Sequence, residues 1–327
     1  MPRNPTMYIL TMTDADILMT DSFGRRITDV RIAVNSACNL RCVYCHREGE
    51  DINEGCTRKE VGTELSRDEI VEVVTLLQSL GVRTLKLTGG EPTLRRDLVE
   101  LIGSLPKDGL EISMTTNGTR LAELARPLKE AGLARVNISI DSLRPERYAK
   151  ITGRNQLPQV LKGLEAAVTA GLTPVKINTV LLPGVNDDEI EDFLTFVRGQ
   201  DDLILQFIEL MDMNGWADGF DASLHSRAGF AAELEERFKR EAKQVTTRRM
   251  HHRHKYNLNG ATVEIVRPMH NAEFCANCNR LRITSDGLLK PCLLRCGNEI
   301  SMKGLHGDAL REALRRAVEN RSPYFRG

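Results

Sequence analysis

The chain has 327 residues, of which 41% are hydrophobic, and its 45 basic side chains (Lys+Arg) equal its 45 acidic ones (Asp+Glu). This length is enough for a large core and predicts either about two domains or one large barrel. The formal net charge of zero and the aromatic content of 5% argue against nucleic-acid and membrane-surface binding. No apolar run reaches the ~18 residues of a membrane-spanning helix. Because the N-terminal residues also lack a signal-peptide pattern, we expect a cytoplasmic protein.

From Val30 onward, short β-rich segments alternate with segments of helical periodicity, at roughly the 30-residue spacing of βαβ units. The expected strands are residues 31–36, 84–88, 110–115, 136–140, 174–181 and 203–207. The expected helices are residues 66–80, which have a Ser66/Glu69 capping box, 94–105, 121–131, 159–170 and 187–197. This alternation predicts an α/β fold, an incomplete (β/α)6 barrel with functional residues at the carboxyl ends of its strands.

The pattern changes near residue 222, where we place a domain boundary. Residues 1–222 would form the partial barrel with an N-terminal arm, and residues 223–327 a C-terminal domain. Within this domain we expect helices at 224–243 and 308–320 and a strand at 261–266. The run 248–255 contains His251, His252 and His254, but its arginines would repel a metal cation, so we interpret it as an exposed basic loop.

Cys38, Cys42 and Cys45 follow the first expected strand with the spacing CxxxCxxC. Three thiolates this close can hold three irons of a four-iron, four-sulfur cluster and leave the fourth iron open to a small ligand. The alternative is a structural zinc site, although such a site normally has four ligands in paired spacing. Eight cysteines in a chain of this kind indicate metal or redox chemistry in a reducing compartment.

Cys275, Cys278 and Cys292 form a second set of three near the C-terminal end. The spacing of this set alone leaves zinc as a stronger alternative than it is for the first set. Cys56 and Cys296 remain as fourth ligands, spare thiols or buried small residues.

Two motifs resemble those of radical S-adenosylmethionine (SAM) enzymes: the CxxxCxxC run with Tyr44 before its last cysteine, and Gly89-Gly90-Glu91-Pro92. The segment 274–284, followed by Lys290-Pro291-Cys292-Leu293, closely resembles the GTP 3′,8-cyclase family of molybdenum cofactor biosynthesis. This resemblance covers nearly the whole chain from Asp21 onward. It implies conversion of GTP to (8S)-3′,8-cyclo-7,8-dihydroguanosine 5′-triphosphate by a deoxyadenosyl radical.

The resemblance also implies two [4Fe-4S] clusters and SAM as cofactors, one cluster on each cysteine set, with the second set in a C-terminal extension. It implies SAM contacts at Tyr44, Gly90, Glu91, Ser139 and Met211. It implies GTP contacts at Arg31, Lys86, Thr115, Lys176, Arg280 and Arg282, with catalytic roles for Arg280, Arg282 and Gly327. The chain departs from the family at two positions: Lys86 stands where arginine is common, and Gly327 is a single terminal glycine where the family has two.

Two partners are implied: a reducing electron donor, and the cyclic pyranopterin monophosphate synthase that takes the product. The sequence leaves the oligomeric state open, with a homodimer as one of the states. Two other functions stay open from the sequence. One is a radical SAM enzyme that matures a peptide and carries an auxiliary cluster, and the other is a cysteine-ligated zinc-binding module. Iron and sulfide content separates the zinc module from both enzymes.

Overall fold

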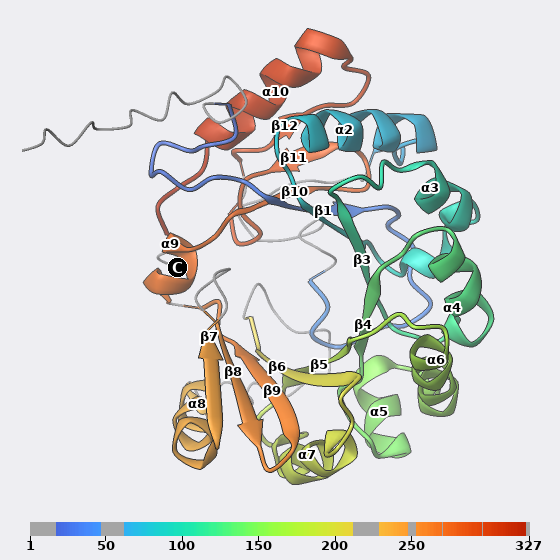
Figure 1. Ribbon diagram of the computed structural model, residues 1–327, viewed down its shortest axis with the longest axis vertical. Helices are drawn as coiled ribbons and strands as arrows, with labels where there is room; N and C mark the ends of the chain where they lie inside the picture. Colours follow the sequence, from blue (N-terminus) through green and yellow to red (C-terminus); the bar gives the residue numbers. More distant parts are fainter. Residues whose placement is uncertain are drawn as a thin grey trace, which may run out of the picture.

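The computed structural model describes residues 18–46, 62–211, 229–247, 253–269, 271–295 and 297–324. These residues contain a 12-stranded sheet with the order β12-β11-β10-β1-β2-β3-β4-β5-β6-β9-β8-β7. The sheet curls around an open centre and carries helices on its outside (Figure 1). Its strands are β1 (Asp29–Ala33), β2 (Thr84–Thr88), β3 (Glu111–Thr116), β4 (Arg135–Ser139), β5 (Val175–Leu181), β6 (Leu203–Glu209), β7 (Gln244–Thr247), β8 (His254–Leu258), β9 (Ala261–Val266), β10 (Arg280–Ile283), β11 (Leu288–Lys290) and β12 (Ile300–Ser301).

The helices are α2 (Arg67–Ser79), α3 (Leu98–Ser104), α4 (Leu121–Glu130), α5 (Pro145–Thr152), α6 (Leu157–Thr169), α7 (Ile190–Val197), α8 (Phe230–Glu241), α9 (Ala272–Ala276) and α10 (Gly307–Glu319), with short 3-10 turns η2 (Pro92–Leu94) and η3 (Asp187–Glu189). None of these described helices has the length and the apolar character needed to cross a membrane. The predicted capping box is confirmed, because the Ser66 and Glu69 side chains bond each other's backbone N–H groups.

Strands β1 to β6 pair in sequence order, and every one of these pairs is parallel. The chain after β6 builds onto both edges of this unit, since β10 pairs parallel to β1 and β9 parallel to β6. The outer strands β11, β12, β8 and β7 are antiparallel. Because β12 and β7 end the strand order without pairing to each other, the predicted incomplete barrel is confirmed. The domain boundary expected near residue 222 lies outside the described residues.

The alternation of side chains along each strand separates the core from the barrel interior. In β1, Val30 and Ile32 are fully buried in the hydrophobic core, whereas Asp29 and Arg31 line the interior cavity. The same alternation in β2 places Lys86 in the cavity, between two buried leucines. A polar residue at every second position of a strand therefore points into the barrel.

Two helical segments differ from the sequence prediction. Helix α3 begins at Leu98, not at residue 94, because Arg95 is extended and its Nη1 donates to the carbonyls of Val34 (2.8 Å) and Leu65 (3.0 Å). Helix α5 was not predicted; it is only 8 residues long, and its readable signals are Pro145 in the first turn and Gly153 at its C-terminal end. The expected N-terminal arm lies largely outside the described residues.

The interpretation of residues 248–255 as an exposed loop is wrong for their described part. Arg253 lines the interior cavity with a side chain that is only 13% exposed, and β8 begins at His254. Pairing of β8 with β9 brings Arg253, the residue before β8, to this cavity. His251 and His252 lie outside the described residues.

Candidate active site

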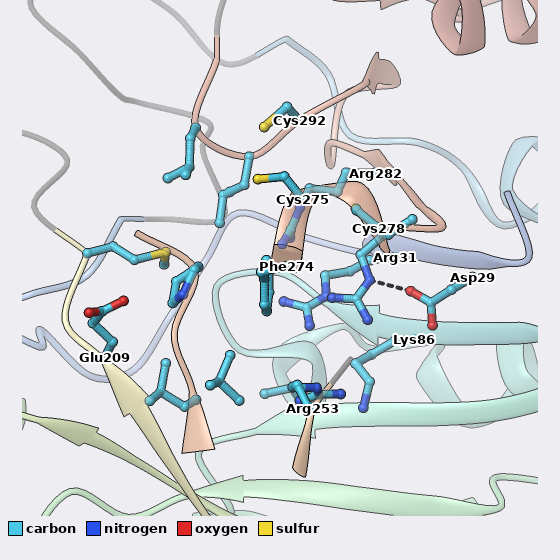
Figure 2. A pocket seen from close by; sticks show the side chains of 18 of the residues that line it. Asp29, Arg31, Lys86, Glu209, Arg253, Phe274, Cys275, Cys278, Arg282 and Cys292 are labelled. Atoms are coloured by element: carbon cyan, nitrogen blue, oxygen red, sulfur yellow. Dashed lines mark hydrogen bonds and ion pairs between the residues drawn. The ribbon is translucent and has the colours of Figure 1, made fainter. Parts of the chain in front are cut away.

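The barrel interior holds a cavity of about 340 Å³, which is within the size range of small-molecule sites. It is lined by most of the predicted site residues: Arg31, Tyr44, Lys86, Thr115, Lys176, Met211, Cys275, Cys278, Arg280, Arg282 and Cys292. Figure 2 shows how the labelled residues of this group converge from β1, β2, β10, helix α9 with the segment that follows it, and the segment around Cys292. Other predicted residues are not part of the lining: Cys38, Cys42, Cys45, Gly90, Glu91 and Ser139. Gly327 lies outside the described residues.

Positive charge dominates this cavity although the chain as a whole is neutral. The basic lining residues are Arg25, Arg31, Lys86, Arg135, Lys176, Arg253, Arg280, Arg282, Arg295 and Arg321, whereas the acidic ones are Asp29 and Glu209. Low-dielectric walls strengthen the field of such a group of charges. The cavity therefore favours a small, highly anionic ligand.

Asp29 fixes Arg280 at one wall of the cavity. Its Oδ1 accepts a hydrogen bond from Arg280 Nε, and its Oδ2 accepts one from the Thr84 hydroxyl at 2.8 Å. Burial raises the pKa of Asp29, but the charge and hydrogen bond of Arg280 outweigh it and leave the pKa below its ordinary value. Asp29 was not among the residues predicted from the sequence, although it stands two residues before Arg31 and therefore on the same face of the strand.

A second buried ion pair joins the two halves of the chain across the β6–β9 junction. Lys176 Nζ lies 2.6 Å from the fully buried Glu264 carboxylate, and Arg253 Nη1 lies 3.8 Å from the same oxygen. Arg253 also donates to Gln206 Oε1 at 3.0 Å, and Gln206 donates to Asn178 at 2.8 Å. Of these residues only Lys176 was predicted, because nothing local in the sequence shows which strands become neighbours.

Lys86 lies near the centre of the cavity wall, where its ammonium group donates to Asn137 Oδ1 at 3.1 Å. Burial is the largest cause that lowers its pKa well below the ordinary value, followed by the charges of Arg31, Arg135 and Arg280. An anionic ligand would offset these repulsions, so this site favours an anion over water.

The first cysteine loop is held between two supports. On one side, Arg41 N–H and Val43 N–H donate to the carbonyls of Thr152 (2.9 Å) and Ile151 (3.0 Å) at the end of α5. On the other side, the glycine turn after β2 packs so closely that a Cβ on Gly90 would overlap the carbonyl oxygens of the cysteine loop. The glycines therefore serve the contact with this loop, whatever ligand they also approach.

Tyr44 is positioned by a buried carboxylate at the end of β4. Its hydroxyl donates to Asp141 Oδ2 at 2.5 Å, while Asp141 Oδ1 accepts from Val180 N–H at 2.9 Å. Burial raises the pKa of Asp141 to about 6, against the opposing effect of both hydrogen bonds. Through these two hydrogen bonds Asp141, at the end of β4, links Tyr44 of the cysteine loop to Val180 on β5. Tyr44 also lines the cavity.

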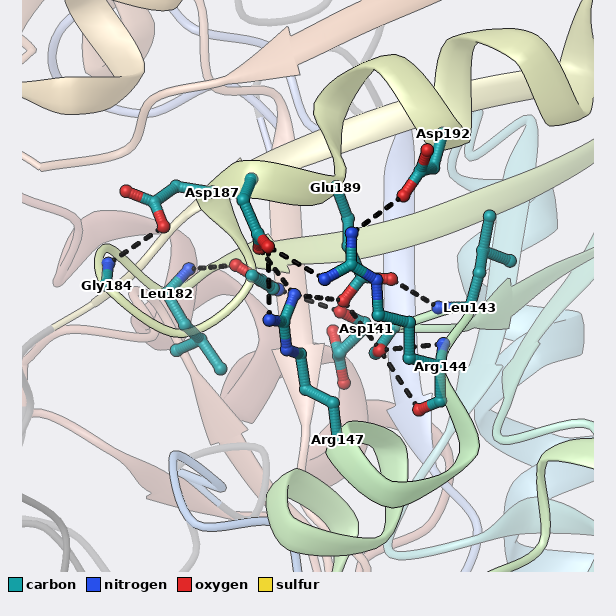
Figure 3. A network of polar contacts seen from close by, with 12 residues as sticks. Asp141, Leu143, Arg144, Arg147, Leu182, Gly184, Asp187, Glu189 and Asp192 are labelled. Atoms are coloured by element: carbon teal, nitrogen blue, oxygen red, sulfur yellow. Dashed lines mark hydrogen bonds and ion pairs between the residues drawn. The ribbon is translucent and has the colours of Figure 1, made fainter.

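The loop that carries Asp141 is in turn fixed by a polar network (Figure 3). Buried Glu189 accepts from the Ser142 hydroxyl (2.7 Å) and from Leu143 N–H (2.8 Å), and it pairs with Arg147 (2.6 Å). Buried partners of this kind lose their free energy of interaction if either is removed. The network thus fixes the loop that carries Asp141, and through Asp141 it helps to position Tyr44. Glu189 and Arg147 themselves are not part of the cavity lining.

Glu91 is buried and its carboxylate already has several donors. It accepts from Thr93 N–H (3.0 Å), from the hydroxyls of Thr93 and Thr116 (2.6 Å each), and from Asn117 N–H (2.7 Å). Burial raises its pKa, and these hydrogen bonds oppose that shift. In this structure Glu91 therefore joins the turn after β2 to the end of β3.

Each cysteine set offers three thiols, the donor group that iron–sulfur clusters bind. The six described cysteines of these sets form no disulfides. Burial raises the pKa of Cys42 in the first set, and the charges of Asp141 and of the other two thiols raise it further. Burial is also the largest cause that raises the pKa of Cys292 in the second set, and a backbone hydrogen bond at Leu294 opposes it. Within the described ranges, no three His, Cys, Asp or Glu side chains surround a point that could take a single metal ion. A larger four-iron group bound to thiolates suits three neighbouring cysteines.

Comparison with protein families gives two matches that together span most of the chain. Residues 32–197 match the Radical SAM superfamily, and residues 203–326 match Molybdenum Cofactor Synthesis C. A relative from Methanocella arvoryzae, named "Probable GTP 3′,8-cyclase", is 45% identical over 94% of this chain and 95% of its own length. A relative of the same name from Archaeoglobus fulgidus is 46% identical over 95% of this chain and 100% of its own length.

Solved structures agree on the fold. The structure described as "Native anSMEcpe with bound AdoMet" has a TM-score of 0.59 at 20% identity and covers 88% of this chain and 81% of its own. The structure of Streptococcus suis SuiB has a TM-score of 0.56 at 15% identity. The match covers 81% of this chain and 60% of SuiB. With relatives above 40% identity over nearly its full length and both family matches in place, the chain belongs to the GTP 3′,8-cyclase family of the radical SAM superfamily.

Proposed function

We propose that this protein converts GTP to (8S)-3′,8-cyclo-7,8-dihydroguanosine 5′-triphosphate, the first step of molybdenum cofactor biosynthesis. The observation that carries the proposal is the cavity, which combines the second cysteine set with an excess of basic side chains. A nucleoside triphosphate needs both an anion site and a place for its base. The two relatives of this protein described above are named for the same activity.

The first cysteine set, by this proposal, holds a [4Fe-4S] cluster that binds SAM. When bound, cluster and SAM supply the radical that removes a hydrogen atom from the ribose. The protein's part is to orient SAM through Tyr44, Gly90, Ser139 and Met211. Glu91 acts by holding the turn of Gly90, since its carboxylate is occupied by neighbouring donors.

The second set, Cys275, Cys278 and Cys292, is proposed to hold another [4Fe-4S] cluster beside the purine of GTP. Figure 2 shows Cys275 and Cys292 at the same end of the cavity as Arg282. Gly327, as the last residue, is proposed to reach the same cavity, because Tyr324 only three residues earlier lines it. A terminal residue without a Cβ can approach a ligand closely.

The remaining cations are proposed to bind the triphosphate and ribose. Arginine is suited to phosphate oxygens because its planar fork donates two parallel hydrogen bonds, while lysine acts as a point charge. The cations in this role are Arg31, Lys86, Lys176, Arg253, Arg280 and Arg282, and the hydroxyl of Thr115 joins them; all of these residues line the cavity. Fixing the substrate between two cofactor sites is the main catalytic contribution of these side chains.

Two partners follow from the chemistry proposed here. Reductive cleavage of SAM consumes an electron, so a reducing donor is required. The cyclised nucleotide must be taken by a further enzyme, for which cyclic pyranopterin monophosphate synthase is the candidate.

One assay tests the function directly. Anaerobically purified, reduced protein is incubated with GTP and SAM, and the amounts of GTP, SAM and 5′-deoxyadenosine are followed by chromatography. We expect GTP and SAM to be consumed together, with the cyclised product appearing. Deoxyadenosine formed without loss of GTP would contradict the assigned substrate, and retention of SAM would contradict the reaction class.

GTP binding is expected to raise the pKa of Lys86, and it should therefore be coupled to proton uptake at pH values between the ligand-free and the ligand-bound pKa. The pKa of this lysine is lowered in the ligand-free protein and would rise beside a triphosphate, so affinity should increase as pH falls towards its ligand-free pKa. Calorimetry in two buffers of different ionisation enthalpy measures the uptake. Lys86→Arg is the matched control, because guanidinium stays protonated. Equal proton uptake by both proteins would contradict the prediction.

Arg253→Gln is expected to weaken GTP binding roughly 10- to 100-fold, the equivalent of one charge-assisted hydrogen bond of about 1.5–3 kcal/mol. The side chain reaches the cavity from the hairpin beyond β6 and stands beside Gln206 and Glu264. Iron content should not change. Arg240→Gln, at an exposed position on α8, is the control. Wild-type affinity in Arg253→Gln would remove the residue from the substrate site.

A further inference from the structure

Three charged side chains outside the roles assigned above form a buried ion triad, Asp21, Arg25 and Arg321. Asp21 Oδ2 lies 2.7 Å from Arg25 Nε and 2.6 Å from Arg321 Nη1. The exposed fractions of the three side chains are 0%, 9% and 2% respectively. Asp21 and Arg321 are 300 residues apart in sequence, so the triad joins the beginning of the described chain to its end.

The triad is anchored to its own turn. Asp21 Oδ1 accepts from the backbone N–H groups of Phe23 (3.0 Å) and Arg25 (2.9 Å). Because these bonds fix the carboxylate independently of Arg321, the turn presents a prepared acceptor to the chain end.

Each arginine of the triad also binds the loop of the second cysteine set. Arg25 Nη1 donates to the Cys275 carbonyl at 2.9 Å, and Arg321 Nη2 donates to the Cys278 carbonyl at 2.7 Å. Two guanidinium groups thus hold the backbone of two proposed cluster ligands.

The same arginine, Arg25, binds the chain end. Its Nη2 donates to the Ser322 carbonyl at 2.6 Å, and its Nη1 also reaches the Pro323 carbonyl at 3.1 Å. Tyr324 directly follows Pro323, and its carbonyl accepts a hydrogen bond from Arg295 Nη2 at 2.8 Å. Ser322 and Tyr324 both line the cavity. The position of the chain end at the cavity therefore depends on the cysteine loop, with Arg25 bonded to both.

Burying these charges has an energetic cost that a merely structural contact would avoid. The removal of a charge from water costs several kcal/mol, and apolar replacements of buried ion pairs are often as stable. Arginine offers what an apolar residue cannot: five donors in a fixed fork that can bind several carbonyls at once. Two arginines against one aspartate also leave a positive excess beside a cluster whose thiolate ligands are negative.

We propose that the Asp21–Arg25–Arg321 triad positions the second iron–sulfur cluster and the chain end as one unit, so that loss of the triad releases both. The proposal rests on the function proposed above in one respect, which is the presence of a cluster on the second cysteine set. Asp21, Arg25 and Arg321 are positioning residues in this account, acting through the cysteine loop and the chain end.

The test uses the anaerobically reconstituted full chain with Cys38, Cys42 and Cys45 replaced by alanine, so that all bound iron belongs to the second set. In this background Arg321→Gln is expected to lose most of the iron. Hydrogen–deuterium exchange should accelerate both at the 275–278 loop and at residues 321–324. Arg315→Gln, an exposed residue of α10 whose ion pairs lie on the surface, is the control.

Two further variants keep the test decisive. Asp21→Asn, which keeps the shape of the side chain, should show the same paired acceleration if Arg321→Gln fails to fold. Arg321→Lys keeps the charge but not the fork. It should restore part of the iron, and it should return the paramagnetic resonance signal of the reduced cluster towards that of the parent protein with the intact triad. A purely structural loss elsewhere would not respond to this exchange of arginine for lysine.

The outcomes separate the two proposals. If the parent protein with an intact triad binds no iron, the second cluster is wrong, while the paired exchange in Arg321→Gln and Asp21→Asn still tests the triad. If the parent binds iron, and the folded variants keep that iron and wild-type exchange in both segments, the triad proposal is wrong. Acceleration at the chain end alone would also overturn it.

Discussion

Replacement of Cys38, Cys42 and Cys45 together by alanine is expected to abolish deoxyadenosine formation and to halve the bound iron, from about eight to about four atoms per chain. The fold should survive, because Cys38 and Cys45 are exposed and the loop backbone is held by other groups. Among these, the Arg41 N–H group bonds to Thr152 whatever side chains the loop carries. Iron analysis measures the bound iron, chromatography measures the 5′-deoxyadenosine formed, and circular dichroism of the same sample checks that the fold survives.

The matched control removes the other set. A variant with alanine at Cys275, Cys278 and Cys292 should keep the first half of the iron but lose GTP cyclisation. SAM cleavage, which needs only the first cluster in the proposed scheme, should remain detectable. Unchanged iron in the first variant, or zinc in its place, would refute the assignment of Cys38, Cys42 and Cys45.

Much of the barrel could be predicted because its information is local. Each expected strand has a buried face and a polar face, and the capping box at Ser66 and the glycines after the helices mark boundaries within a few residues. The cysteine loops and the Gly89-Gly90 turn are also contiguous in sequence. Arg31, Lys86 and Lys176 were expected at the substrate site from the family resemblance, and the alternation of side chains along their strands accounts for their places in the cavity lining.

What could not be predicted depends on pairing between distant segments. The register Asp29↔Arg280 joins strands 251 residues apart, so the ion pair between these residues has no local signal. The basic run before β8 resembled a solvated loop because its partners, Gln206 and Glu264, come from β6 and β9. Short helix α5 was missed because its first-turn proline and its closing glycine enclose only 8 residues, too few for a clear helical period.

Arg280→Ala and Arg282→Ala are each expected to lose GTP binding while keeping both clusters, at a cost of about 1.5–3 kcal/mol per charge-assisted contact. Both side chains project from β10 into the cavity, two residues apart and therefore on one face. Calorimetric titration with GTP measures the loss. Arg315→Ala, on the exposed face of α10, is the control.

The two variants should differ in stability. Arg282→Ala removes a cation from the cavity wall, whereas Arg280→Ala also leaves the Asp29 carboxylate buried without its guanidinium partner. Loss of one partner of a buried ion pair typically costs about 3–5 kcal/mol. Arg280→Ala should therefore lower the free energy of unfolding more than Arg282→Ala does.

A double-mutant cycle with Asp29 separates the structural role of Arg280 from its binding role. In an Asp29→Asn background no carboxylate is left buried without a partner, so the stability cost of Arg280→Ala should fall well below that of breaking a buried ion pair. The loss of GTP affinity should persist in that background, because the guanidinium that meets the ligand is still absent. Recovery of wild-type GTP affinity in Asp29→Asn/Arg280→Ala would mean that Arg280 serves only to neutralise Asp29. An undiminished stability cost would instead mean that the ion pair is not what couples β10 to β1.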